Sequence, residues 1–272
     1  MVRRRPAPAL APYIRGYDGY RFAGLAPGTH QGLPSGGVTF ILSLDGPIDL
    51  VAMPGPQTPR GLEAFVGGLH VTPATIAHPG FGAGVSIDLS PFGCRALFGM
   101  PGAALVSHVV DVADVLGPAG DRLVDEMLTA PTWDDRFAAL DRTLTAALLG
   151  RLDAGTGTGI RPEVRRAWDV LAGSGGRTTV AEVAADVGWS RRHLASCFAA
   201  ELGVTPKTAA RLLRFERTCG LLDRGLGLAD AAAAGGYYDQ SHLTNEWQEL
   251  AGVTPTAWRA EELRDRAVDV ER

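Results

Sequence analysis

A repeat in the last third of this chain limits its possible folds more than any other feature of the sequence. Residues 180–188 (VAEVAADVG) align with residues 228–236 (LADAAAAGG), at an offset of 48 positions. Beyond the following turn the offset becomes 49, because the second copy contains one extra residue. At that offset the matching pairs are Leu194 with Leu243, Phe198 with Trp247, and residues 203–206 (GVTP) with residues 252–255 (GVTP). Two copies in register indicate that one small structural unit occurs twice.

Each copy has the order of residues that a helix-turn-helix requires. A short helix carries a small residue, Ala184 or Ala232, where two helices must approach closely. A glycine follows, at the point where a sharp turn needs a positive φ. Ser190 in the first copy and Asp239 in the second then stand where the N-cap of a new helix is expected.

The second helix of each copy has one apolar and one polar face. Leu194 and Phe198, four residues apart, are expected to point inward in the first copy, as are Leu243 and Trp247 in the second. The opposite face is polar and suits the major groove of duplex DNA. The candidate DNA-binding residues are the two N-cap residues, the polar faces and two cations of the next helix: Ser190, Arg191, Arg192, Ala195, Ser196, Lys207, Arg211, Asp239, Gln240, Ser241, His242 and Asn245.

The two copies differ in charge. Residues 188–217 contain six cations and two acids, a net charge of +4, although the whole chain carries −4. Residues 223–272 contain five cations and ten acids, a net charge of −5. We therefore expect the first unit to supply most of the attraction to phosphates and the second to contribute mainly to base readout. A helix over residues 208–222, roughly 22 Å long, would join the units so that they enter successive major grooves.

These segments resemble a known family. Residues 188–194 (GWSRRHL), 235–243 (GGYYDQSHL) and 251–258 (AGVTPTAW) are similar to the DNA-binding domain of AraC/XylS-type regulators. The resemblance covers the last third of the chain and rests on specific motifs. It implies a two-unit reader of promoter DNA, usually an activator, that often forms a homodimer through its N-terminal domain.

The resemblance also assigns individual positions. The base-contacting positions of the family fall on Arg192, Ala195 and Ser196 in the first unit, and on Gln240, Ser241 and Asn245 in the second. Ala195 departs from the pattern, because its methyl group can contact thymine but cannot hydrogen-bond to a base.

The N-terminal part has a different pattern. Residues 38–44 and 48–51, separated by Asp45-Gly46-Pro47, predict a β-hairpin. Further strands are expected at residues 64–66, 69–71 and 85–89. Such short strands between Gly and Pro clusters favour a small, cupin-like β-barrel or sandwich.

Amphipathic helices follow the strands at residues 116–127 and 133–149, and the small residues of 153–159 predict a linker. The fold class is therefore α+β with two domains. An N-terminal effector or dimerisation domain is expected at residues 1–155, and an all-α DNA-binding domain at 160–265. Its two helix-turn-helix units are expected at about residues 178–202 and 227–251.

Two sets of apolar residues leave alternatives open. Tyr20, Phe22 and Phe40 are candidates for lining a small-molecule site, and they are equally typical of a β-barrel core. The apolar stripe from Phe137 to Leu148 suits either packing within the chain or pairing of two chains.

The remaining composition points away from catalysis. Cys94, Cys197 and Cys219 form neither a disulfide framework nor a zinc motif and suit a reducing compartment. No signal peptide or membrane-spanning apolar run is present, so we expect a cytoplasmic protein. We expect no catalytic residue, no metal and no cofactor.

The sequence thus predicts a sequence-specific transcriptional regulator that is not an enzyme. Its expected partners are double-stranded promoter DNA, RNA polymerase, an unknown small-molecule effector and, as an option, a second copy of the chain. The main alternative is an enzyme, dependent on a metal or on a cysteine, that is fused to a DNA-targeting domain. A third hypothesis is a helix-turn-helix pair that binds protein instead of DNA.

Overall fold

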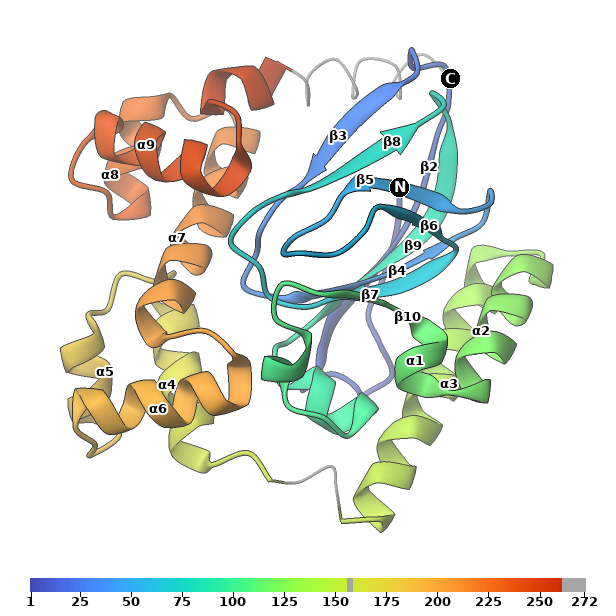
Figure 1. Ribbon diagram of the computed structural model, residues 1–272, viewed down its shortest axis with the longest axis horizontal. Helices are drawn as coiled ribbons and strands as arrows, with labels where there is room; N and C mark the ends of the chain where they lie inside the picture. Colours follow the sequence, from blue (N-terminus) through green and yellow to red (C-terminus); the bar gives the residue numbers. More distant parts are fainter. Residues whose placement is uncertain (156–158, 261–272) are drawn as a thin grey trace.

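The computed structural model describes residues 1–155 and 159–260, and it has a β-rich N-terminal part followed by helices (Figure 1). Part of the predicted linker, residues 156–158, and the last predicted domain residues, 261–265, lie outside the described residues. Within the described residues, no helix combines the length and the apolar character that crossing a membrane requires.

The N-terminal strands form two antiparallel sheets, which confirms a sandwich and not a closed barrel. The six-stranded sheet has, in spatial order, β1 (Val2–Arg4), β2 (Ile14–Phe22), β9 (Gly82–Leu89), β4 (Val38–Ser43), β7 (Ala64–Gly67) and β10 (Val109–Asp111). The four-stranded sheet has β3 (Gly28–Gly32), β8 (Ala74–His78), β5 (Ile48–Ala52) and β6 (Arg60–Leu62).

The predicted hairpin between β4 and β5 is wrong. Strand β4 pairs with β9 and β7 in one sheet, whereas β5 pairs with β8 and β6 in the other. Both strands have apolar side chains that need a buried face, such as Phe40 in β4 and Leu50 in β5. The chain between them crosses from one sheet to the other, so the two faces lie opposite each other.

The N-terminal part also contains two short helices, η1 (Cys94–Phe98) and η2 (Gly102–Leu105), and three α-helices, α1 (Val112–Leu116), α2 (Pro118–Thr129) and α3 (Trp133–Asp153). On α3, Phe137, Leu140, Leu144 and Leu148 are all buried in the same core as residues of the six-stranded sheet. The stripe from Phe137 to Leu148 is therefore used for packing within the chain.

The C-terminal part is helical (Figure 1), with α4 (Pro162–Gly173), α5 (Val180–Asp186), α6 (Arg191–Leu202), α7 (Pro206–Asp223), α8 (Leu228–Gly235) and α9 (Gln240–Ala251). Residues 255–260 are helical as well. Helix α7 runs between the α4–α6 group and the α8–α9 group. Each group has its own core, with the rings of Trp168 and Phe198 stacked in the first. In the second, Phe215 of α7 and Trp247 of α9 have ring centroids 4.7 Å apart.

The N-terminal part packs directly against the first helical group. Leu69 and Phe92 belong to the same buried cluster as Trp168 and Phe198. The ring of Phe92 meets the ring of Trp168 edge-on, with centroids 6.3 Å apart. This shared core fixes the position of the first group relative to the sandwich.

Candidate nucleic-acid interface

The first repeat folds as a helix-turn-helix. Helix α5 begins with a capping box, in which the Thr179 side chain and Glu182 each bond to the backbone of the other residue. The turn after α5 contains Gly188 at φ 70°, a conformation that disfavours residues with a Cβ. The Ser190 hydroxyl then accepts a hydrogen bond from the N–H of His193 at 3.2 Å, which confirms it as the N-cap of α6.

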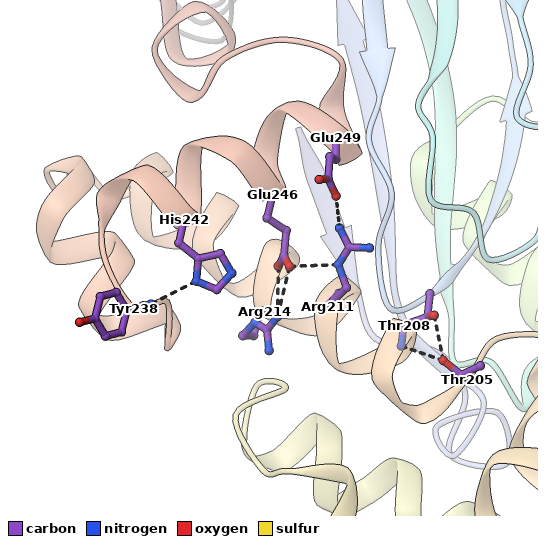
Figure 2. Close-up of polar contacts among 8 residues, drawn as sticks. All are labelled: Thr205, Thr208, Arg211, Arg214, Tyr238, His242, Glu246 and Glu249. Carbon is purple, nitrogen blue, oxygen red and sulfur yellow. Dashed lines mark hydrogen bonds and ion pairs between the residues drawn. The ribbon is translucent and has the colours of Figure 1, made fainter. Parts of the chain in front are cut away.

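The second repeat has the same construction between α8 and α9. Gly236 occupies the turn at φ 85°. The carboxylate of Asp239 accepts a hydrogen bond from the N–H of His242 at 2.7 Å, which confirms Asp239 as the N-cap of α9. The ring of His242 contributes to the same turn, because its Nδ1 accepts a hydrogen bond from the N–H of Tyr238 at 3.3 Å (Figure 2).

The second helix of each unit buries its apolar face and exposes its polar face. Leu194, Phe198, Leu243 and Trp247 are 0% exposed. With the whole chain present, ten of the predicted DNA-binding residues are exposed: Ser190, Arg191, Arg192, Ser196, Lys207, Asp239, Gln240, Ser241, His242 and Asn245. Ala195 and Arg211 are half-buried. The sandwich therefore leaves both polar faces accessible.

Some of these residues meet in a groove between the two units. Lys207, Arg211, His242 and Asn245 line a groove of about 530 Å³, together with Arg177 and other residues at the start of α5. The remaining candidates are not part of its lining. Its lining also includes Arg214, Glu246 and Glu249 and no residue of α6, so the groove lies between the start of α5, α7 and α9.

Two cations and one acid of α7 are neutralised within the protein. Arg211 pairs with Glu246 at 3.0 Å and also with Glu249, and Arg214 pairs with Glu246 at 3.3 Å (Figure 2). Glu216, also on α7, pairs with Arg15 of the sandwich at 3.1 Å.

The two acids of residues 188–217 also pair outside this stretch, Glu201 with Arg95 and Glu216 with Arg15, so the unpaired charge of the first unit is still +4. Arg191, Arg192, Lys207 and Arg217 make no ion pair with any residue in the described ranges. Their charges remain available to phosphates.

Sequence reasoning missed two exposed side chains at this surface. Tyr238 is 93% exposed in the turn before α9, next to the buried Tyr237. Arg177 is exposed at the edge of the groove, where its Nε donates a hydrogen bond to the carbonyl of Ser174 at 3.0 Å. The adjacent tyrosines of the motif were a signal for a surface residue, but the sequence alone does not distinguish which tyrosine is outside.

The predicted ligand-binding residues separate into two environments. Tyr20 and Phe22 line a cavity of about 360 Å³ between the two sheets. Phe40 does not, because it is 0% exposed in the sandwich core with its ring centroid 6.5 Å from that of Phe98. Sequence reasoning missed His30 and His78, which also line the cavity.

The enzyme alternative gains no support from the cysteine beside Arg95. Cys94 is 0% exposed, and burial raises the pKa of its thiol to about 12, so it remains protonated and weakly nucleophilic. Within the described residues no group of three or more metal-ligating side chains is suitably clustered.

Comparison with known proteins supports the helix-turn-helix structure of the C-terminal part. Residues 183–261 match a family model described as a helix-turn-helix domain, and residues 2–111 match one described as a domain of unknown function (DUF6597). The uncharacterized HTH-type transcriptional regulator YbfI of Bacillus subtilis (strain 168) is 38% identical over 56 residues, which are 21% of this chain. The chain matches only 20% of the length of that relative.

Solved structures share the overall fold. ToxT from Vibrio cholerae has a TM-score of 0.56 and 10% identity, covering 90% of this chain and 98% of its own. ToxT bound to (E)-4-(8-methylnaphthalen-1-yl)but-3-enoic acid has a TM-score of 0.55 and 9% identity over 90% of this chain and 98% of its own.

The fold and the two exposed recognition helices thus define the class: the C-terminal part is a DNA-binding domain with a pair of helix-turn-helix units. More specifically, it is the AraC-type helix-turn-helix domain of transcription regulators, attached to a β-sandwich as in ToxT.

Proposed function

We propose that this chain is a sequence-specific transcriptional regulator that binds promoter DNA through both helix-turn-helix units under the control of a small molecule. The observation that carries the proposal is the exposure of both polar helix faces in the presence of the sandwich. A helix-turn-helix reads base edges with residues near the start of its second helix. Arg192 and Asn245 have the side chains that commonly recognise guanine and adenine.

The groove between the units supports the same mode of binding. Arg177 and Lys207 line it on the side of the first unit, and Asn245 lines it on the side of the second. A phosphate backbone in this groove would lie beside the cations while α6 and α9 occupy the major grooves on either side. Helix α7, with eighteen residues, has a length of about 27 Å that suits this spacing.

The sandwich offers a route by which a bound molecule could act on the second unit. Strands β3 and β8 pair with each other, and both line the cavity, through His30 and His78. At their other ends, Leu33 packs against the core of the second unit and Pro73 lies 3.6 Å from the position of a Cβ built on Gly252. A molecule that changes the spacing of the sheets would therefore change the support of the second unit.

Binding to DNA is tested with a duplex that the parent chain selects from a random library. Fluorescence anisotropy at fixed salt compares the parent with Arg191→Ala and Arg192→Ala. The Arg192 change is expected to weaken binding by ~1–3 kcal/mol if it pairs with guanine. Arg122→Ala, an exposed arginine on α2, is the control and should bind as the parent does. Parent-like binding by both α6 variants would contradict the proposal.

The proposal includes two further partners. RNA polymerase would be recruited or blocked at the promoter, and a second copy of the chain is an option for binding paired half-sites. Its target would be chromosomal promoter DNA, so the protein would act in the cytoplasm. It would bind this DNA without chemical conversion and would therefore not be an enzyme. In vitro transcription from the selected promoter distinguishes activation from repression.

A further inference from the structure

The sandwich contains a cavity of about 360 Å³ whose walls come from both sheets. Tyr20 and Phe22 of β2 and Ile41 of β4 line it from the six-stranded sheet. Ile48 of β5 and Ile76 of β8 line it from the opposite sheet. This volume suits a molecule of one or two rings, since ligand pockets of small molecules begin near roughly 300 Å³.

Two glycines of β9 make room for the aromatic wall. A Cβ at Gly82 would lie 2.8 Å from the ring of Phe22, and one at Gly84 would lie 2.5 Å from the hydroxyl of Tyr20. Side chains at these two positions would displace both rings. The shape of the cavity therefore depends on glycine at these two positions of β9.

One polar atom in the cavity wall lacks a partner. Nδ1 of His78 is buried and makes no hydrogen bond with any described residue. The ring of Phe22 meets the His78 ring edge-on at 5.9 Å, so that it covers the imidazole without bonding to it. A buried nitrogen left without a partner is destabilising, and a ligand group that forms a hydrogen bond with it would remove this cost.

The electrostatics of the wall limit the charge of the ligand. The lining includes no Arg or Lys, and Asp45 lies exposed at the mouth. Burial, with a smaller effect from Asp45, raises the pKa of Tyr20 to about 12, so its hydroxyl stays protonated. A carboxylate would lose its hydration here and would meet Asp45 but no arginine or lysine.

We propose that this cavity binds an uncharged, ring-containing molecule whose hydroxyl or carbonyl group forms a hydrogen bond with Nδ1 of His78. The molecule would be the effector of the proposed function, so its role as an effector, though not its binding, rests on that function. Such a cavity would differ from a site for carboxylic acids, such as the acid bound to ToxT.

The test measures binding of three matched probes to the full chain by calorimetry near neutral pH, without DNA. The probes are 1-naphthalenemethanol, 1-methylnaphthalene and 1-naphthoate. We expect the alcohol to bind about tenfold more tightly than either of the others, as one recovered hydrogen bond predicts. Equal or tighter binding of the carboxylate would overturn the proposal.

Two variants locate the site. His78→Phe should remove the advantage of the alcohol over 1-methylnaphthalene while the apolar probe still binds, and Ile76→Trp should block all three probes by filling the cavity. His108→Phe, an exposed histidine outside the cavity, is the control. An alcohol advantage that survives in His78→Phe would overturn the assignment. If the alcohol binds tightly and DNA affinity does not change, the binding site is supported and only its role in effector control is contradicted.

Discussion

The two helix-turn-helix units each bury one carboxylate of their second helix, and the partners of these carboxylates differ. In the first unit, Glu201 of α6 pairs with Arg95 of the sandwich at 2.7 Å. In the second, Glu246 of α9 pairs with Arg211 of α7 at 3.0 Å, and with Arg214. The two acids do not occupy equivalent positions of the repeat, since Leu250 stands where the first copy has Glu201.

This difference shows what positions each unit. The first unit is fixed by the N-terminal sandwich, through the Arg95–Glu201 pair and the contact of Phe92 with Trp168. The second unit is fixed mainly by α7, and the sandwich touches it at Leu33 and Pro73. A conformational change in the sandwich would therefore break fewer contacts in moving the second unit than in moving the first.

The largest expected effect comes from removing Glu246, which joins α9 to α7 in the second unit. Glu246→Ala leaves the half-buried Arg214 without a carboxylate and Arg211 with Glu249 alone. The loss of one partner of a buried pair costs about 3–5 kcal/mol. Urea unfolding of the full chain measures this cost. Glu249→Ala is the matched control, because the Glu249 side chain is 67% exposed and its removal should cost at most ~1 kcal/mol. Equal costs for both variants would show that Glu246 does not hold α9 on α7.

The next effect tests the division of labour between the two units on DNA. Lys207→Ala should weaken binding to all sequences and lower the salt dependence by about one phosphate contact. Asn245→Ala should leave the salt dependence unchanged and reduce discrimination at one base pair by ~1–3 kcal/mol. Anisotropy titrations at several salt concentrations measure both quantities. A change of salt dependence in Asn245→Ala alone would reverse the assignment.

A smaller effect is expected from releasing the first unit. Arg95→Ala removes the partner of Glu201, whose side chain is 10% exposed, at a cost of about 1–2 kcal/mol. Hydrogen exchange should increase at the end of α6 and in residues 102–105, which pack against it. Arg166→Ala breaks the more exposed pair with Asp186 and serves as the control, with no change in exchange at this contact. Unchanged exchange in Arg95→Ala would mean that the shared core alone holds the first unit.

The sequence predicted the parts of the site that depend on neighbours along the chain. The caps Ser190 and Asp239, and the buried positions Leu194 and Trp247, follow from helix periodicity and capping chemistry over a few residues. These interactions are local, so the pattern of one segment determines them.

The sequence did not predict what depends on distant partners. The pairing of β4 with β9, the ion pair between Arg211 and Glu246, and the placement of Phe40 in the core each join residues far apart in the chain. Alternation of apolar residues shows that a strand buries one face but does not identify the strand beside it.

The smallest effect concerns pH and the attachment of α7 to the sandwich. Burial raises the pKa of Asp88 from 3.8 to about 6, against the lowering effect of Arg15, which bonds to both Asp88 and Glu216. Because the folded state then binds the proton more tightly than the unfolded state, stability should fall as pH rises from about 4 to about 6 and level off above that range. The Asp88 side chain is 44% exposed, so solvent screening keeps the change below ~1 kcal/mol. Asp88→Asn should flatten this part of a urea-unfolding profile, whereas Asp49→Asn on β5 should not. When Asp88 is protonated, Arg15 pairs with Glu216 alone, so lower pH should strengthen the attachment of α7 to the sandwich. A pH profile of stability that becomes steeper in Asp88→Asn would contradict this role of Asp88.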